Sequence, residues 1–404
     1  MAHLRIALLC MVLALGLARP AWAVFLFPIE GKLGLLNGAN NQRNSEDNLK
    51  SSGSEVELSL APVWAQRGKS GLRFTPTYDL DYNSVGTVLR VEEELFLFTQ
   101  QMTNAVTLGG GYKTSADTRF GVKAFYEAFN GKVATDEPWT YGLYDYQDLG
   151  ADLNWSAKWA LRVPTRTTLG LRGTQRKYPH YVSLDAEERH EKDSNLGRAY
   201  FNLEFVWNTQ TPVFTLISVS NESSSYAQSL IVDATGTTNS GERRRDSVTN
   251  FSISLPIEGE KQSWDLAYDL ESRDSNLNYF DSQDLTYIPD YNDYAEHAFV
   301  LSFGYNFDGP WWVLKKPQLT LGASATARVY AQRLAKNDKG EYTTAKEIDN
   351  TFGFDLGFNT PLASFLSAYL KVDFQGHRSN NADAGTSLAN YNFTTTSLGT
   401  RFAV

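Results

Sequence analysis

The feature of this sequence that most restricts its fold is a strict alternation of apolar and polar residues, clearest in QLTLGASATARVY at residues 318–330. The odd-numbered positions, from Leu319 to Val329, are apolar, and the even-numbered positions are polar, small or amphipathic. Side chains alternate between two faces with a period of two in a β-strand. This segment is therefore predicted to be a strand with one apolar face and one wet face.

The same alternation recurs along the chain and predicts an all-β protein with sixteen strands and no long amphipathic helix. The predicted strands are 55–66, 71–82, 88–99, 105–114, 118–129, 146–159, 165–177, 197–209, 212–222, 247–256, 263–275, 294–308, 318–331, 349–358, 364–377 and 392–402. Residues 24–54 are interpreted as an N-terminal periplasmic extension or as an extra strand beginning at Ile29. The extra strand requires one more elsewhere to keep an even number, so eighteen strands is the alternative.

The first 23 residues have the pattern of a secretory signal peptide. Arg5 precedes an apolar run over 6–17, and Ala21 and Ala23 form an A-x-A cleavage site. The single cysteine, Cys10, lies in this segment, so the mature chain is expected to have no disulfide and no thiolate site. Of the 37 basic residues, Arg5 and Arg19 also lie there, which leaves 35 against 46 acidic ones. This acidic balance argues against nucleic acid as a partner.

The connections between the predicted strands alternate in length from residue 118 onward. The long ones are 130–145, 178–196, 223–246, 276–293, 332–348 and 378–391; the short ones are 160–164, 210–211, 257–262 and 359–363, with 309–317 intermediate. Outer-membrane barrels have short periplasmic turns and long extracellular loops. The alternation therefore predicts an up-and-down transmembrane barrel over 55–404 whose last strand ends in the periplasm.

Strand length and the placement of aromatic residues favour a barrel in lipid over a soluble β-sandwich, which also alternates. The predicted strands have about ten residues or more, as a tilted membrane strand requires, whereas soluble strands usually have about five or six. Tryptophans gather near predicted strand ends, as at Trp155 and Trp159 and at Trp311 and Trp312. Trp and Tyr are typical of the membrane–water interface.

The C-terminal segment TTTSLGTRFAV resembles the closing strand of the bacterial outer-membrane β-barrel family, the porin-like channels. Thr396, Leu398, Thr400 and Phe402 share one face, although the family usually ends in an aromatic residue and this chain ends in Val404. The resemblance implies the outer membrane of a Gram-negative bacterium as location. It also implies outer-membrane lipid, lipopolysaccharide and the barrel-assembly machinery as partners, and it leaves a homo-oligomer open.

In such a barrel the wet face lines the lumen, and sixteen to eighteen strands leave a water-filled channel. Alternation predicts pore-lining basic residues and pore-lining acidic residues in similar numbers. The basic candidates are Arg119, Lys123, Arg172, Arg176, Arg198 and Arg328. The acidic candidates are Asp152, Glu204, Asp265, Asp269, Glu271 and Asp355. Two groups are predicted to set selectivity, one comprising Arg172, Arg176 and Arg198 and the other Asp265, Asp269 and Glu271.

Catalysis, cofactors and metals are not expected. The histidines beyond residue 23 are His180, His190, His297 and His377, and no nucleophile motif accompanies them. The acidic segment LDAEERHEKDSN lacks a spaced calcium-loop pattern. The basic cluster RRRD at 243–246 is interpreted as part of a solvated loop, with lipopolysaccharide phosphates as an alternative ligand.

The main functional hypothesis is a channel for passive passage of small hydrophilic solutes. The first alternative is an export pore for a secreted polymer such as an exopolysaccharide, working with a periplasmic partner. The second alternative is a structural or adhesive barrel closed by its loops. Small polar solutes or a polysaccharide are therefore the expected cargo.

Overall fold

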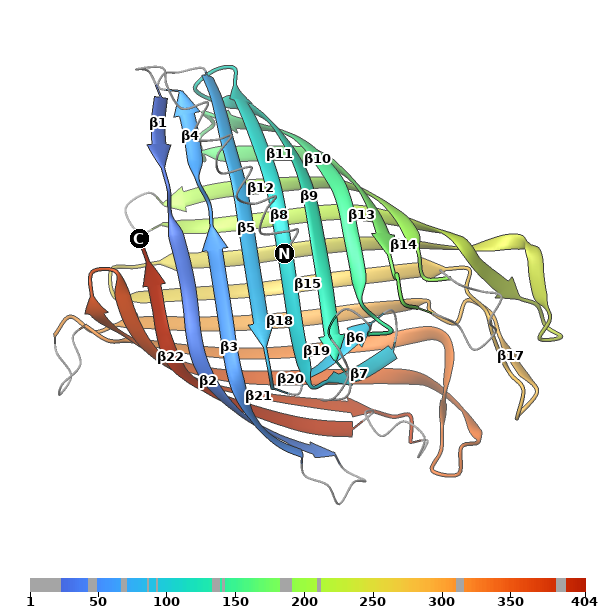
Figure 1. Ribbon diagram of the computed structural model, residues 1–404. Helices are drawn as coiled ribbons and strands as arrows, with labels where there is room; N and C mark the ends of the chain where they lie inside the picture. Colours follow the sequence, from blue (N-terminus) through green and yellow to red (C-terminus); the bar gives the residue numbers. More distant parts are fainter. Residues whose placement is uncertain are drawn as a thin grey trace.

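The alternating segments are β-strands that hydrogen-bond side by side in one closed antiparallel ring (Figure 1). The computed structural model describes residues 23–42, 49–66, 71–85, 87–91, 94–132, 139, 142–181, 191–208, 212–309, 316–382 and 390–404. Apart from Ala23, the predicted signal peptide lies outside the described residues. In the part of the chain that is described, no helix is long and apolar enough to cross a membrane.

Sixteen strands form the ring, as predicted, and each pairs with the next along the chain. They are β2 (Ile29–Gln42), β3 (Leu49–Leu60), β5 (Gly71–Asn83), β8 (Gln100–Lys113), β9 (Thr118–Lys132), β10 (Tyr146–Trp159), β11 (Thr165–Lys177), β12 (Ser194–Asn208), β13 (Val213–Val232), β14 (Thr238–Glu258), β15 (Gln262–Ser275), β18 (Tyr294–Asn306), β19 (Gln318–Lys336), β20 (Tyr342–Ala363), β21 (Leu366–Ser379) and β22 (Asn390–Ala403). The ring closes where β22 pairs with β2, from Glu30↔Ala403 to Gln42↔Tyr391. The alternative of eighteen ring strands is therefore wrong.

Two short strands, β1 (Ala23–Leu26) and β4 (Val63–Gln66), continue β2 and β3 beyond two prolines. Pro28 separates β1 from β2, and Pro62 separates β3 from β4. Proline lacks the N–H that a sheet ladder needs, so each long strand is interrupted there. β1 and β4 nevertheless pair with each other in the same antiparallel sense.

Two strand assignments from the sequence differ from the structure. One adds a ring strand and the other removes one, so the total of sixteen is unchanged. The structure places a ring strand, β2, within 24–54, whereas the predicted ring strand 88–99 is a separate hairpin. That hairpin consists of β6 (Thr87–Val91) and β7 (Glu94–Phe98), which pair with each other and form their own small sheet. Alternation identifies a strand but not its partner. The two halves of this segment pair with each other and not with a ring strand.

Two predicted long loops, 223–246 and 332–348, are largely strand. β13 and β14 continue to a turn at 233–237, and β19 and β20 continue to a turn at 337–341. Each of these extended pairs has register shifts, between Ser225 and Ile231 and between Val329 and Lys336. The Ser- and Thr-rich composition that suggested loops is equally suited to a two-stranded ribbon, one that here also buries residues such as Ser229, Ile231 and Ala335.

The connections define two ends of the barrel. One end, here the turn end, carries the short connections 67–70, 114–117, 160–164, 209–212, 259–261, 307–317 and 364–365. The two termini of the ring meet there, because Ile29 and Val404 exchange backbone hydrogen bonds of 3.0 and 2.9 Å. The opposite end, here the loop end, carries 43–48, 84–99, 133–145, 178–193, 276–293 and 380–389 and both ribbons. It also carries a second hairpin, β16 (Tyr279–Asp281) with β17 (Thr286–Ile288).

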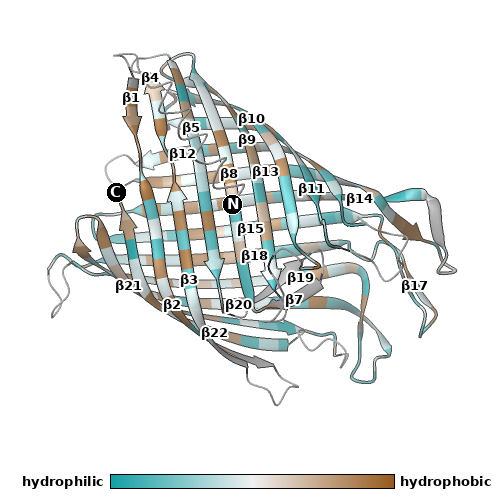
Figure 2. Ribbon diagram, viewed as in Figure 1, coloured by the Kyte–Doolittle hydropathy of each residue, from teal (hydrophilic) through white to brown (hydrophobic). Residues whose placement is uncertain are grey.

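The two faces of the ring differ in polarity, and the colours along its strands alternate accordingly (Figure 2). The outer face carries exposed large apolar side chains on strand after strand, such as Leu35, Leu149, Leu171, Phe354 and Leu398. The inner face carries the charged residues. A soluble protein rarely exposes so continuous an apolar surface.

Candidate functional site: the inner face of the barrel

All twelve predicted pore-lining residues lie on the inner face. The register shows this for one cross-strand row, in which Asp152 on β10, Arg172 on β11 and Arg198 on β12 are direct partners. Their chain neighbours Leu153 and Leu171 point the other way and are more than half exposed on the outer face. The same alternation and pairing place the remaining nine on the inner face: Arg119, Lys123, Arg176, Glu204, Asp265, Asp269, Glu271, Arg328 and Asp355.

The predicted basic group is divided by its contacts. Arg176 makes two hydrogen bonds to the Asp148 carboxylate, of 2.8 and 2.7 Å, and its guanidinium lies 4.3 Å from the centre of the Tyr146 ring. Its charge is therefore compensated. Arg172 and Arg198 are direct partners on adjacent strands and contact neutral groups. Arg172 Nε lies 3.4 Å from Thr174 and its guanidinium 4.1 Å from the centre of the Phe125 ring, and Arg198 Nη2 lies 3.0 Å from Ser220.

The predicted acidic group remains together on β15. Asp265, Asp269 and Glu271 occupy alternate positions of one face, and Glu271 lies directly opposite Glu296 on β18. Asp265 accepts a hydrogen bond from Ser254 Oγ (2.9 Å), and Glu271 accepts one from the Tyr294 hydroxyl (2.5 Å). Both partners are neutral, so this part of the wall stays negative.

The remaining predicted residues take part in local contacts. Arg328 is paired with Glu296 (2.7 Å) and stacks 3.8 Å from the centre of the Tyr294 ring. Glu204 is paired with Arg166 (2.9 Å). Asp355 lies opposite Asp373 on β21.

A network at the turn end was missed because β2 was not assigned to the ring. Lys32 on β2 lies 2.6 Å from Glu55 and 2.9 Å from Glu57 on β3. The Tyr369 hydroxyl on β21 donates to Glu55, and Arg401 on β22 lies 5.0 Å from the centre of the Tyr369 ring. The network borders a cavity of about 770 Å³ at the turn end. Recognising 29–42 as a strand would have placed Lys32 on the wet face.

The segment between β5 and β8 is anchored to the inner face near the loop end. Val85, at its start, packs in a buried cluster with Leu36, Tyr391 and Phe393, three inner-face residues of β2 and β22. Phe98, at its end, packs edge-on against Phe129 of β9, with ring centres 5.7 Å apart. Val85 and Phe98, the two described ends of the segment, are thus held inside the ring at the loop end.

Ion pairs also organise the connections beyond the ring at the loop end. Asp281 of β16 accepts hydrogen bonds from Lys336 (2.7 Å) and Tyr342 (2.9 Å) of the β19–β20 ribbon, and these bonds, Lys336 first, hold the pKa of Asp281 well below its usual range. The β16–β17 hairpin is therefore fixed to the neighbouring ribbon by the charge of Asp281.

Asp293, at the loop end, has a raised pKa. Burial raises it to about 6, although the carboxylate accepts the Ser275 backbone N–H at 2.6 Å.

The basic cluster 243–246 is part of β14 and not a solvated loop. Arg244 is buried, pairs with Asp246 (2.9 Å) and stacks on Tyr226, whereas Arg243 and Arg245 are exposed. Alternation along β14 separates them, so the cluster is not one continuous basic patch.

The histidines described by the structure have structural contacts. His377 stacks on Tyr391 with ring centres 5.3 Å apart and lies 4.0 Å from Asp349. His297 faces outward, with Nδ1 2.8 Å from the Tyr268 hydroxyl. His190 lies outside the described residues. Within the described ranges no three His, Cys, Asp or Glu side chains gather as metal ligands.

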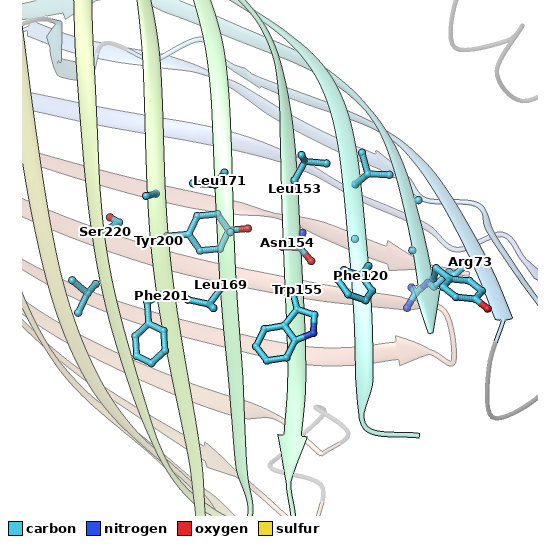
Figure 3. A pocket seen from close by; sticks show the side chains of 18 of the residues that line it. Arg73, Phe120, Leu153, Asn154, Trp155, Leu169, Leu171, Tyr200, Phe201 and Ser220 are labelled. Carbon is cyan, nitrogen blue, oxygen red and sulfur yellow. The ribbon is translucent and has the colours of Figure 1, made fainter. Parts of the chain in front are cut away.

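The outer face has a wide apolar concavity of about 1100 Å³ that extends from β4 and β5 to β14 (Figure 3). Phe120, Leu153, Leu169 and Phe201 contribute outward side chains to it. Acyl chains of a bilayer are suited to such a surface.

Comparison with known proteins assigns no family. No family model and no curated protein match the chain. Among solved structures, OmpT of Vibrio cholerae is similar over 96% of this chain and 99% of its own, with 10% identity and a TM-score of 0.44. OpdQ of Pseudomonas aeruginosa covers 94% and 98%, with 11% identity and a TM-score of 0.44. A bacterial polysaccharide outer membrane secretin covers 92% and 97%, with 9% identity and a TM-score of 0.43. At such identities and scores these likenesses assign no function to the chain.

Proposed function

We propose that this protein is an outer-membrane channel through which small hydrophilic solutes pass passively. The observation that carries the proposal is the polarity of the closed ring, whose sixteen strands are apolar outside and charged inside. In lipid, a closed ring is the arrangement that satisfies every backbone group of a sheet. A ring of this size leaves an aqueous lumen.

The orientation follows from the ends. The loop end, with its hairpins and ribbons, faces the exterior, and the turn end faces the periplasm, as in bacterial barrels generally. Solutes then enter past the segment at 84–99 at the loop end and leave past the Lys32 network at the turn end.

The inner face supports passage of polar solutes of either sign. Acidic residues dominate β15 and β18, whereas basic residues dominate β9 and β11. Opposed charges across an aqueous lumen orient polar solutes and disfavour apolar ones. We therefore expect weak overall ion selectivity.

Single-channel recording tests the proposal. The refolded barrel is inserted into a planar bilayer in potassium chloride, and steady current steps are expected, with partial block by added sugars. Correctly folded protein that inserts but carries no current would contradict the channel and favour a structural barrel closed by its loops.

A further inference from the structure

One part of the inner face is rich in glycines and in basic residues. It consists of three adjacent cross-strand rows that run over β5, β8, β9, β10 and β11. From the turn end, the rows are Gly71–Lys113–Arg119–Ser156–Thr168, Arg73–Gly111–Gly121–Asn154–Gly170, and Thr75–Gly109–Lys123–Asp152–Arg172. We call this area the glycine patch. It holds five cations, Arg73, Lys113, Arg119, Lys123 and Arg172, and one acid, Asp152.

The five cations are exposed, and none of them forms an ion pair with another described residue. Several other inner-face cations are paired, such as Lys32 with Glu55, Arg176 with Asp148 and Lys371 with Asp373. The single acid of the patch is engaged by neutral donors. Asp152 accepts hydrogen bonds from the Tyr200 hydroxyl (3.0 Å) and from Asn154 Nδ2 (2.9 Å). The patch therefore has a surplus of positive charge.

The glycines of the patch leave room for neighbouring side chains to lie over the backbone. An added Cβ on Gly111 would lie 3.1 Å from Nε of Arg119, and one on Gly121 would lie 2.5 Å from Oδ1 of Asn154. Arg119 thus lies flat over Gly111, whose register partner on β5 is Arg73. The two arginines therefore flank the same glycine, and each guanidinium carries N–H donors.

The size of the patch makes its charges act together. Strands are about 4.8 Å apart and alternate residues of a strand about 6.7 Å apart, so five strands and three rows measure about 19 by 13 Å. Neighbouring cations then lie within one Debye length, about 8–10 Å. A wall of one sign raises the local concentration of counter-ions.

We propose that the glycine patch binds the oxyanion group of a solute, a carboxylate or a phosphate, while the solute crosses the barrel. The planar arginine fork matches both groups, and charge-assisted hydrogen bonds to it are stronger than neutral ones. This inference rests on the proposed channel and names its substrate class as small anionic metabolites. The selectivity element is then Arg73 and Arg119 with Lys123, and not the predicted group that contained Arg176.

The first test is block of the single-channel current by inorganic phosphate and by succinate, at constant ionic strength. Wild-type current is expected to fall with increasing anion. In the double variant Arg73→Gln/Arg119→Gln, the half-blocking concentration is expected to rise by about tenfold or more, because hydrogen bonds to a charged group are lost. The matched control is Lys371→Gln/Arg401→Gln, which removes two inner-face cations outside the patch and should block like wild type.

The second test does not require conduction. Folded barrel in detergent is acetylated with and without phosphate, and modification of each lysine is followed by mass spectrometry. Phosphate should slow modification of Lys113 and Lys123 several-fold and leave Lys371 unchanged. Equal protection of all three lysines, or none, overturns the inference, as does a conducting wild type that neither anion blocks. Absence of current with protection of Lys113 and Lys123 would contradict the channel alone.

Discussion

An arginine placed on the outer face should be far more costly than one placed on the adjacent inner-face position. Ala325 and Ser324 on β19 are suited to this comparison because both are small, exposed and next to each other. Ala325 lies between Phe299 and Phe352 on the apolar face, and Ser324 lies between Val300 and Gly353 on the inner face.

The magnitude follows from the depth of Ala325. The outward positions of β19 run from Leu319 to Val329, a span of ten residue steps that rises about 34 Å along the strand. At a tilt of about 45° this is about 24 Å along the membrane normal, close to the apolar band of about 25 Å in known barrels. Ala325 is one residue from the middle of the span, where an outward arginine costs about 2–4 kcal/mol. The unfolding equilibrium constant should therefore rise about 30- to 900-fold.

Reversible denaturant unfolding in phospholipid vesicles measures the difference. Ala325→Arg should lose about 2–4 kcal/mol, whereas Ser324→Arg, on a solvated wall, should change the free energy of unfolding by about 0.5 kcal/mol. If both variants lose the same amount, or if Ser324→Arg loses more, the apolar face does not face lipid and the assignment of the two faces is refuted.

Three further predictions concern the contacts inside the barrel and at the loop end. Asp148→Asn removes the charged partner of Arg176 and should lower the free energy of unfolding by about 1–3 kcal/mol in the same assay. Adding Gln147→Glu to this variant should not restore the loss, because residue 147 lies on the outer face. Phe98→Ala removes a ring that is 1% exposed, so the segment at 84–99 should detach and single-channel conductance should increase; an unchanged conductance would show that this segment does not narrow the lumen. Because the pKa of Asp293 is raised from 3.8 to about 6, the folded loop favours the protonated carboxyl. That stabilisation is complete below about pH 3.8 and is lost as pH rises through 6. Hydrogen exchange near Ser275, corrected for intrinsic rates, should therefore be slower at pH 5 than at pH 7, and Asp293→Asn should abolish the difference.

The sequence predicts the parts of this fold that depend on local periodicity. Alternation identifies fifteen of the ring strands, although it makes β13, β14 and β20 too short, and it places residues such as Arg119 and Asp265 on the inner face, because the side-chain period is a property of the strand itself. It does not reveal which strand pairs with which. For that reason the hairpin β6–β7 is mistaken for a ring strand, and β2, whose partners are 20 and 370 residues away, is left open.

The candidate site likewise has a part that local periodicity predicts and a part that depends on which strands pair. The sequence places Arg172, Arg176 and Arg198 together, but the pairing of Arg176 with Asp148 depends on the register between β10 and β11. Arg166 and Lys113 share the parity of the predicted pore-lining residues and also lie on the inner face. The glycine patch requires five strands in register, since Gly121 and Gly170 join Gly111 in one row only in the folded ring.

The seam between β2 and β22 has a consequence for how this protein reaches its folded state. Any assembly that contains fewer than all sixteen strands is an open sheet with two unsatisfied edges, and in lipid each unpaired backbone group costs several kcal/mol. A partly built ring is therefore not a smaller barrel with a narrower lumen, because it cannot persist in the bilayer unless something else covers both edges. We therefore expect insertion and closure of this chain to be coupled, with Glu30 meeting Ala403 as part of the contact that completes the ring.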